Sequence, residues 1–268
     1  MYFSKVLLKP DKIEGIFREV LKSEKSQSKE GIRYSPAKYE DHQLVWKLFW
    51  NNPDMERNFL FRKEMASRQS GNGRNFPVFY VLSEHRPTNY EDWFHIETKL
   101  YAPILATGDR LHFSLRVNPV ISKPKFGDTS NGDNKRKSAR HDVLMNAKHL
   151  TSKNYDEKYG EDVWKKDPEL YSAFLKDVKV AQEKDAKQWL IKRGQNLGFE
   201  LSENGFALGR IDFMQDPVHG RKKKLKLVFV DYEGVLTVTD SEQFIRTLTT
   251  GIGKSKGLGC GMFLVKRV

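Results

Sequence analysis

Midway along the chain, one stretch restarts a pattern of strands and helices, and it reads Leu111-His112-Phe113-Ser114-Leu115-Arg116-Val117-Asn118-Pro119. Apolar and polar residues alternate through it, which is typical of a half-buried strand with Arg116 on the face opposite Leu115 and Val117. A strand of the same kind opens the chain at residues 2–8. We therefore expect two tandem domains, at residues 1–108 and 109–268.

The first domain should contain four strands and two helices. Leu44, Val45, Leu48 and Phe49 recur at helical spacing, and Asn51-Asn52-Pro53 then stops the helix. The polar residues 15–33 have no clear period and are either helix or loop. The order strand, helix, strand, strand, weak helix, strand is that of a ferredoxin-like βαββαβ domain, which RNA-recognition modules also use. Runs of β-branched and aromatic residues indicate the three later strands, at 59–62, 76–82 and 94–101.

The second domain repeats this order with an insertion. An amphipathic helix is expected from residue 178 to 197, where Gly198 ends it, and a second helix from Ser241 to Thr250. The sequence therefore predicts an α+β protein made of two tandem ferredoxin-like domains. The charged segment 123–176 is expected to be an expanded surface loop. The strands that follow the first helix are expected at 199–201 leading through 206–214, at 225–239, and at 261–265.

The composition favours a polyanionic partner. The 268 residues include 47 Lys and Arg against 35 Asp and Glu, which gives a formal net charge of +12 and a pI near 9.5. Nucleic acid is the polyanion that such a charge favours. Because 38% of the residues are hydrophobic and 12% aromatic, the chain has enough apolar material for a folded core.

Several other classes of protein are excluded by what the sequence lacks. Cys260 is the single cysteine, so an internal disulfide and a thiolate zinc cluster are excluded, and no His-x-x-x-His or Glu-x-x-His pair supplies metal ligands. No run approaches the ~18 apolar residues of a membrane span, and the first residues read as a strand, not as a signal peptide. We expect a cytoplasmic protein that needs no metal or other cofactor and does not contact membrane.

A glycine-rich stretch near the C-terminus, from Gly251 to Gly261, places five glycines around Lys254 and Lys256. Repeated glycines can form a concave array of N–H donors suited to phosphate. A P-loop is excluded because Leu248 stands where its first glycine is required. A dinucleotide-binding fingerprint is excluded because Lys256 stands where its last glycine is required. A simple flexible turn remains the alternative. The expected phosphate-binding residues of this loop are Gly251, Gly253, Lys254, Lys256, Gly257 and Gly259.

Two further basic clusters are candidate RNA-binding sites. One follows Asp216-Pro217 in the predicted hairpin between the later strands, and the other lies in the charged insertion. Solvated loops of no function are the alternative, because runs of charge are usually just exposed. The candidates are Arg221, Lys222, Lys223, Lys224 and Lys226 in the hairpin, Arg136, Lys137 and Arg140 in the insertion, and Arg116 on the restarting strand.

Blocks spread over nearly the whole chain resemble the CasE family, the pre-crRNA endoribonucleases of type I-E Cascade within the RAMP superfamily. Each block is modest alone, but all five occur in the family's order. The charged insertion 123–176 departs from the family's compact form. The blocks are Met1-Tyr2-Phe3-Ser4-Lys5-Val6, Tyr39-Glu40-Asp41-His42, the restarting strand Phe113 to Pro119, Phe229-Val230-Asp231-Tyr232-Glu233-Gly234-Val235-Leu236, and Gly251 to Gly261.

The resemblance implies metal-independent cleavage of CRISPR repeat RNA at the 3′ base of its hairpin. The ribose 2′-OH attacks the adjacent phosphate, leaving a 5′-hydroxyl and a 2′,3′-cyclic phosphate. His42 falls at the family's general acid/base position and Tyr39 at the position that orients the ribose or phosphate. Lys47 matches, more weakly, a lysine that stabilises transition-state charge. The implied partners are the repeat hairpin, its crRNA product and other Cascade subunits, above all the backbone subunit, and the basic hairpin is expected along the RNA stem.

Two other functions remain open on the sequence. Many paired-domain RAMP proteins bind guide RNA without cutting it, and Tyr39 and His42 argue against such a scaffold. A metal-dependent nuclease would need clustered carboxylates. Asp231 and Glu233 are the nearest pair, and no third ligand is evident.

Overall fold

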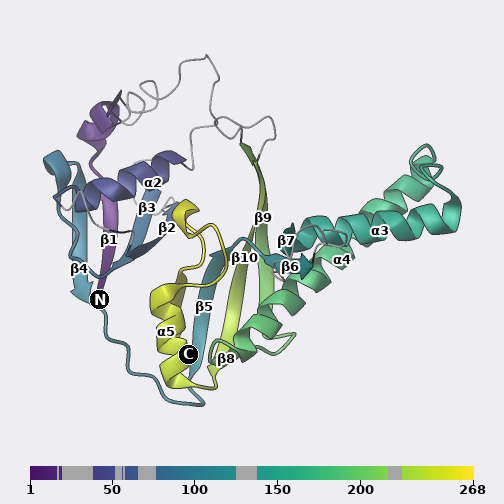
Figure 1. The fold of residues 1–268 in the computed structure, drawn as a ribbon. Helices are drawn as coiled ribbons and strands as arrows, with labels where there is room; N and C mark the ends of the chain where they lie inside the picture. The colour runs from purple at the N-terminus through teal and green to yellow at the C-terminus, as the bar shows by residue number, and fades with distance from the viewer. Residues whose placement is uncertain are drawn as a thin grey trace, which may run out of the picture.

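The computed structural model in Figure 1 contains two large antiparallel sheets, one from each half of the chain, and a smaller two-stranded sheet, all within the described residues. The described residues are 1–16, 18–19, 39–51, 56, 58–65, 77–124, 138–216 and 225–268.

The first sheet has the strand order β2-β3-β1-β4, and every neighbouring pair is antiparallel. This is the order of a ferredoxin-like domain. Helix α2 (Tyr39–Trp46) covers one face and continues into a 3₁₀ turn, η2 (Lys47–Phe49). Where a weak second helix is predicted, the structure has only one short 3₁₀ turn, η3 (Tyr90–Asp92), just before the last strand. The strands are β1 (Tyr2–Leu8), β2 (Phe59–Met65), β3 (Pro77–Ser83) and β4 (Phe94–Leu100).

Alternation along these strands explains why α2 lies where it does. Val6, Leu8, Phe79 and Val81 point to one face of the sheet and are buried against the apolar side of α2. The polar residues 15–33 of the sequence are described only in part. A 3₁₀ turn, η1 (Pro10–Lys12), follows β1, residues 13–16 and 18–19 are helical, and the rest lies outside the described residues.

The second sheet repeats the topology with the order β11-β5-β10, and both β8 and β9 pair with the far side of β10. Helices α4 (Pro168–Gln195) and α5 (Ser241–Thr250) are the two crossovers. The prediction of two ferredoxin-like units in an α+β protein is therefore confirmed. The strands are β5 (Arg110–Val117), β8 (Phe199–Glu200), β9 (Phe206–Asp216), β10 (Leu225–Val238) and β11 (Phe263–Arg267).

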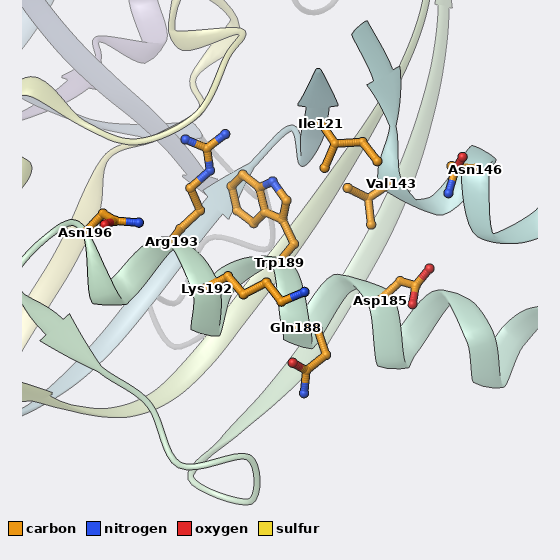
Figure 2. Close-up of a pocket in the computed structure, with 9 residues that line it drawn as sticks. All are labelled: Ile121, Val143, Asn146, Asp185, Gln188, Trp189, Lys192, Arg193 and Asn196. Carbon is orange, nitrogen blue, oxygen red and sulfur yellow. The ribbon is translucent and has the colours of Figure 1, made fainter. Parts of the chain in front are cut away.

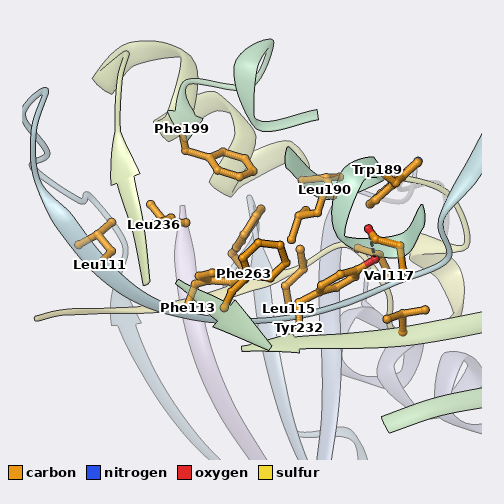
Figure 3. Packing of buried hydrophobic residues seen from close by; sticks show 14 of the residues in the cluster. Leu111, Phe113, Leu115, Val117, Trp189, Leu190, Phe199, Tyr232, Leu236 and Phe263 are labelled. Atoms are coloured by element: carbon orange, nitrogen blue, oxygen red, sulfur yellow. Dashed lines mark hydrogen bonds between the residues drawn. The ribbon is translucent and has the colours of Figure 1, made fainter. Parts of the chain in front are cut away.

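The core of the second sheet lies between its strands and its helices (Figure 3). Phe113 and Leu115 of the restarting strand point into it, as the alternation predicts. Tyr232 is fully buried there, and its phenol donates a 2.9 Å hydrogen bond to the carbonyl of Ala186 on α4. Burial raises the pKa of Tyr232, so the phenol stays a neutral donor.

The expectation of a surface loop over 123–176 is wrong for the part that the structure describes. Strands β6 (Val120–Pro124) and β7 (Ser138–Asp142) form a hairpin, and α3 (Val143–Tyr159) then packs antiparallel to α4 as an arm that projects from the second sheet (Figure 1). The segment looks like loop in sequence because only a narrow stripe of each helix is apolar. The small core of the arm contains Tyr155, Trp164, Phe174 and Val178.

Each helix of the arm begins at an aspartate cap. Asp142 accepts hydrogen bonds from the backbone N–H groups of Leu144 and Met145, and Asp167 does the same for the start of α4. Even α4, at 28 residues, is too polar to cross a membrane, as is every other helix in the described part of the chain.

The faces of the two sheets that are not covered by helices meet each other. Leu60 and Leu82 of the first sheet pack with Met262, which precedes β11 of the second. Nearby, Nη2 of Arg62 on β2 donates a 2.9 Å hydrogen bond to Oγ of Ser114 on β5. The two units are thus joined by both apolar packing and a partly buried polar contact.

Candidate active site and nucleic-acid interface

His42 lies on α2, and its ring is enclosed by aromatic side chains. Its Nε2 accepts a 3.0 Å hydrogen bond from the indole Nε1 of Trp46, one turn later. The rings of Phe59 and Phe61 on β2 are each 6.4 Å away, centroid to centroid. Tyr39 is the first residue of the same helix. The half-buried imidazole is therefore held between α2 and the strand beneath it.

Lys47 does not join His42. Its Nζ lies 2.5 Å from Oε1 of Glu19 and 4.3 Å from the centre of the Tyr90 ring. Partial burial lowers the pKa of Lys47, but the hydrogen bond and charge of Glu19 outweigh it, so the pKa is raised. The ammonium is thus a firmly charged partner of Glu19 in a cluster separate from the imidazole.

The glycine-rich loop has a defined backbone geometry. Gly251, Gly253 and Gly259 have positive φ, and Ser255 is left-handed at φ 59°. The backbone N–H of Ile252 donates to the carbonyl of Gly261 at 2.9 Å, which closes the loop at its base. A 3₁₀ turn, η4 (Lys256–Leu258), forms its tip.

This loop packs against the first sheet, next to the residues around His42. The turn η4 contacts α2 and β2. A Cβ at Gly259 would lie 3.2 Å from the Phe61 ring, and one at Gly251 would lie 2.9 Å from Leu60. Phe61 is therefore a neighbour of both the glycine-rich loop and His42. The tertiary structure brings together two sequence blocks more than 200 residues apart.

The two lysines of the loop have different surroundings. Lys254 is exposed and forms a backbone bridge to Asn118. Nζ of Lys256 donates a 2.6 Å hydrogen bond to the carbonyl of Thr250 at the end of α5. Gly257, the remaining glycine of the expected set, lies within η4.

Arg116 lies in an ion-pair cluster on the second sheet. Its guanidinium bonds to Asp212 and to Asp231, the latter at 3.1 Å, and only 19% of its side chain is exposed. Asp231, one of the two carboxylates that a metal nuclease would need, is thus paired with Arg116. No group of three His, Cys, Asp or Glu side chains arranged for a metal ion occurs in the described ranges.

The other basic candidates are placed only in part. Arg140 is exposed on β7. Lys226 lies on β10 opposite Gln215 of β9, so β9 and β10 do form the predicted hairpin. The backbone at Arg136, Lys137, Arg221, Lys222, Lys223 and Lys224 lies outside the described residues.

Sequence reasoning missed a pocket of about 430 Å³ at the base of the arm (Figure 2). Trp189 of α4 forms part of its wall, with Lys192 and Arg193 one turn further on. The edge of the Trp189 ring also lies 3.7 Å from the position of a Cβ at Gly253. The surface formed by Trp189, Lys192 and Arg193 therefore borders the glycine-rich loop. The adjacent pair Lys192-Arg193 at the end of an amphipathic helix was the signal available in the sequence.

The chain thus has two ferredoxin-like domains, and the glycine-rich loop of the second packs against helix α2 of the first. This arrangement places it in the class of paired-domain proteins. The sequence pattern of the CRISPR-associated protein family matches residues 1–267, and the chain belongs to this family. It is 28% identical over 228 residues to the CRISPR system Cascade subunit CasE of Escherichia coli strain K12, covering 84% of this chain and 89% of that protein. The resemblance to CasE in the sequence is thus confirmed.

Solved structures share the fold. The CRISPR endoribonuclease Cse3 bound to a 19-nucleotide RNA has a TM-score of 0.59 at 22% identity, covering 99% of this chain and all of that one. Thermus thermophilus Cse3 bound to an RNA representing a pre-cleavage complex gives 0.56 at 21% identity, with 99% and 98% covered. The likeness extends over the whole length of these proteins.

Proposed function

We propose that the chain is an endoribonuclease that cleaves CRISPR repeat RNA at the 3′ base of its hairpin and remains bound to the crRNA as a Cascade subunit. Family membership, the similarity to CasE and the similarity to RNA-bound Cse3 support this proposal. Its substrate is a transcript, so the protein would act in the cytoplasm. The backbone subunit of Cascade is the expected neighbour.

The single observation that carries the proposal is the packing of the glycine-rich loop against α2 and β2. This packing brings η4, the turn at the tip of the loop, to the helix that bears His42. A phosphodiester held by the loop would then lie close to a residue able to transfer protons. Such an arrangement needs both halves of the chain. This agrees with the fold similarity to the Cse3 structures, which covers 99% of the chain.

The chemistry requires a proton acceptor for the 2′-OH, a proton donor for the leaving 5′-oxygen and positive charge near the phosphate. We assign His42 as the general acid/base, since imidazole titrates near neutral pH. For His42 to act as a base, the indole N–H of Trp46 must first leave Nε2. Nε2 can then accept the proton of the substrate 2′-OH. Tyr39 would orient the ribose or phosphate, since a phenol with a pKa of ~10 is a poor base. We propose that the reaction needs no metal.

RNA binding would be divided among several surfaces. The hairpin residues Arg221, Lys222, Lys223, Lys224 and Lys226 would follow the stem phosphates, because the deep, narrow major groove of A-form RNA resists readout by side chains. Each phosphate contact should add roughly 0.7–0.9 to the slope of log affinity against log salt. Arg136, Lys137 and Arg140 would extend this track, while Arg116 would contribute less, since two carboxylates already bind its guanidinium.

We further propose that the two functional domains divide near residue 108. There the chain passes from β4 of the first sheet to β5 of the second. The N-terminal unit would then supply His42 and Tyr39, and the C-terminal unit the basic hairpin and the glycine-rich loop.

The test is cleavage of a labelled CRISPR-repeat hairpin from the same genome, in excess EDTA and in parallel reactions without chelator. Wild type, His42→Ala and the control His95→Ala, an exposed histidine on β4, are compared. We expect wild type and the control to cut at the 3′ base of the stem and His42→Ala to bind without cutting. Binding without cleavage by all three would support a scaffold. Cleavage lost only with chelator would support a metal nuclease, and equal cleavage by all three would place catalysis elsewhere.

A further inference from the structure

Three aromatic rings lie together on the face of the first sheet that α2 does not cover. Phe3 is on β1, Tyr80 on β3 and Tyr101 just after β4. The Phe3 ring is 5.9 Å from Tyr80 and 6.0 Å from Tyr101, and the interplanar angles are 31° and 27°. Since β1 and β3 are the two central strands, the rings form an aromatic platform in the middle of the sheet.

The platform borders a pocket of about 280 Å³ whose other wall is β11 of the second sheet, at Leu264 and its neighbours. Lys99 on β4 lies at this pocket with its Nζ 5.5 Å from the centre of the Phe3 ring. The volume is just below the ~300 Å³ at which small-molecule sites begin. The pocket therefore suits one flat ring system with a charge beside it, and it is too small for a duplex.

The platform differs from the packed interface beside it. Leu60, Leu82 and Met262 are 4% exposed or less, whereas the three rings remain only partly buried. Burial raises the pKa of the Tyr101 phenol, so this group stays protonated and can donate a hydrogen bond. The rings thus combine an accessible apolar surface with a donor and a cation.

Unpaired nucleotides are the ligand that such a surface recognises. In sheets of this topology, aromatic side chains on the central strands can stack two or three bases. Stacking tolerates any base, and a nearby cation adds attraction to the phosphate. We propose that the platform of Phe3, Tyr80 and Tyr101, with Lys99, binds single-stranded RNA that flanks the repeat hairpin. This inference rests on the proposed function and adds a second RNA site to it.

The experiment measures binding of three RNAs, each with a 2′-deoxy substitution at the cleavage site so that none is cut. One is the blunt repeat hairpin, and the others add five unpaired nucleotides on the 5′ or the 3′ side. Phe3→Leu removes a ring but keeps apolar bulk, and Lys99→Ala removes the cation. Leu100→Ala is the matched control, because Leu100 is 75% exposed on the same strand and alternates to the opposite face.

We expect Phe3→Leu to weaken binding of one extended RNA by about 5- to 150-fold, the equivalent of one lost base stack. Lys99→Ala should weaken the same RNA by a smaller factor. Both variants should bind the blunt hairpin with an affinity within about twofold of that of wild type. Leu100→Ala should bind all three RNAs within the same twofold range. Equal losses on all three RNAs, or none on either extended RNA, would overturn the platform.

A second measurement does not depend on the variants being stable. In wild type, 4-thiouridine placed in the extension should crosslink to peptides containing residues 2–8, 77–83 or 99–101. Crosslinks confined to other peptides would refute the platform while leaving the proposed cleavage function intact. If wild type binds none of the three RNAs, the proposed function fails and the platform fails with it.

Discussion

The indole N–H of Trp46 donates a 3.0 Å hydrogen bond to Nε2 of His42 on the same helix. The i,i+4 spacing brings the two side chains together, and their rings stand edge to face at 86°. Because an indole nitrogen can only donate, Nε2 must accept. The bond therefore selects the neutral imidazole, the form that a general base requires.

Replacing Trp46 with phenylalanine removes the donor and keeps a ring. We expect the acid limb of the pH profile of kcat/KM for hairpin cleavage to move to higher pH, because the neutral imidazole loses its stabilisation. Trp50→Phe, at a ring that is 54% exposed, is the control. An unmoved acid limb would show that the bond does not tune His42.

Gly259→Ala should slow cleavage through Phe61. Gly259 has φ +77°, and a methyl group there would lie 3.2 Å from the Phe61 ring, which in turn contacts His42. The Phe61 ring would have to yield by only a few tenths of an ångström. A displacement near 1 Å can cost about 100-fold, so we expect a single-turnover rate slower by about 3- to 10-fold.

Gly108→Ala is the matched control for this strain. Gly108 has φ +91° with open space around its Cβ position, so it shares the backbone cost without the contact. Both variants should lose similar stability in thermal melts. If both also lost the same cleavage activity, backbone strain alone would explain the effect of Gly259→Ala.

Arg116 and Arg210 both bond to Asp212, but their surroundings differ. The Arg116 side chain is 19% exposed and that of Arg210 is 75% exposed. Removing one partner of a buried ion pair leaves an uncompensated charge, so we expect Arg116→Met to lower the free energy of unfolding by about 2–4 kcal/mol. Arg210→Met should cost less than about 1 kcal/mol. Urea denaturation measures both, and equal losses would contradict the buried role of Arg116.

The stability contributed by Asp212 should depend on pH. Partial burial opposes its ionisation, but the hydrogen bonds and charges of Arg116 and Arg210 lower the pKa of this carboxyl. A lowered pKa stabilises the fold above the unfolded value of about 3.9, and the contribution is lost as pH falls through the folded value. We expect the difference in unfolding free energy between wild type and Asp212→Asn to be constant from pH 7 to about 5 and to shrink below about 4. A difference that persisted unchanged at pH 3 would contradict this.

Lys47→Met separates a catalytic role from a structural one. Because Lys47 pairs with Glu19 and lies over Tyr90, we expect a loss of about 1–2 kcal/mol of stability and a cleavage rate within about threefold of wild type. Lys153→Met, in an exposed pair with Glu157, should change neither. A rate reduced 100-fold in a stably folded Lys47→Met would instead assign this lysine to the active site.

The sequence was sufficient for elements whose pattern is local. The helix expected from Ser241 to Thr250 has those bounds, and the side chain of Asp240 caps it. The restarting strand alternates as read, because one face of β5 packs on the helices and the other does not. The periods of 2 and 3.6 residues are properties of the backbone, so a single sequence displays them. The helix α3 of the arm was not predicted, because only a few apolar residues lie among its many charged and polar ones.

Contacts between distant segments were decided only by the tertiary structure. Nothing in the local sequence of Lys47 reveals Glu19 as its partner, or places Gly259 against Phe61 and Arg116 between two aspartates. A charged or glycine residue has the same local signature whether it meets RNA or another part of the chain. Which of these it meets depends on how the two sheets pack, and that packing is set by apolar surfaces far apart along the chain.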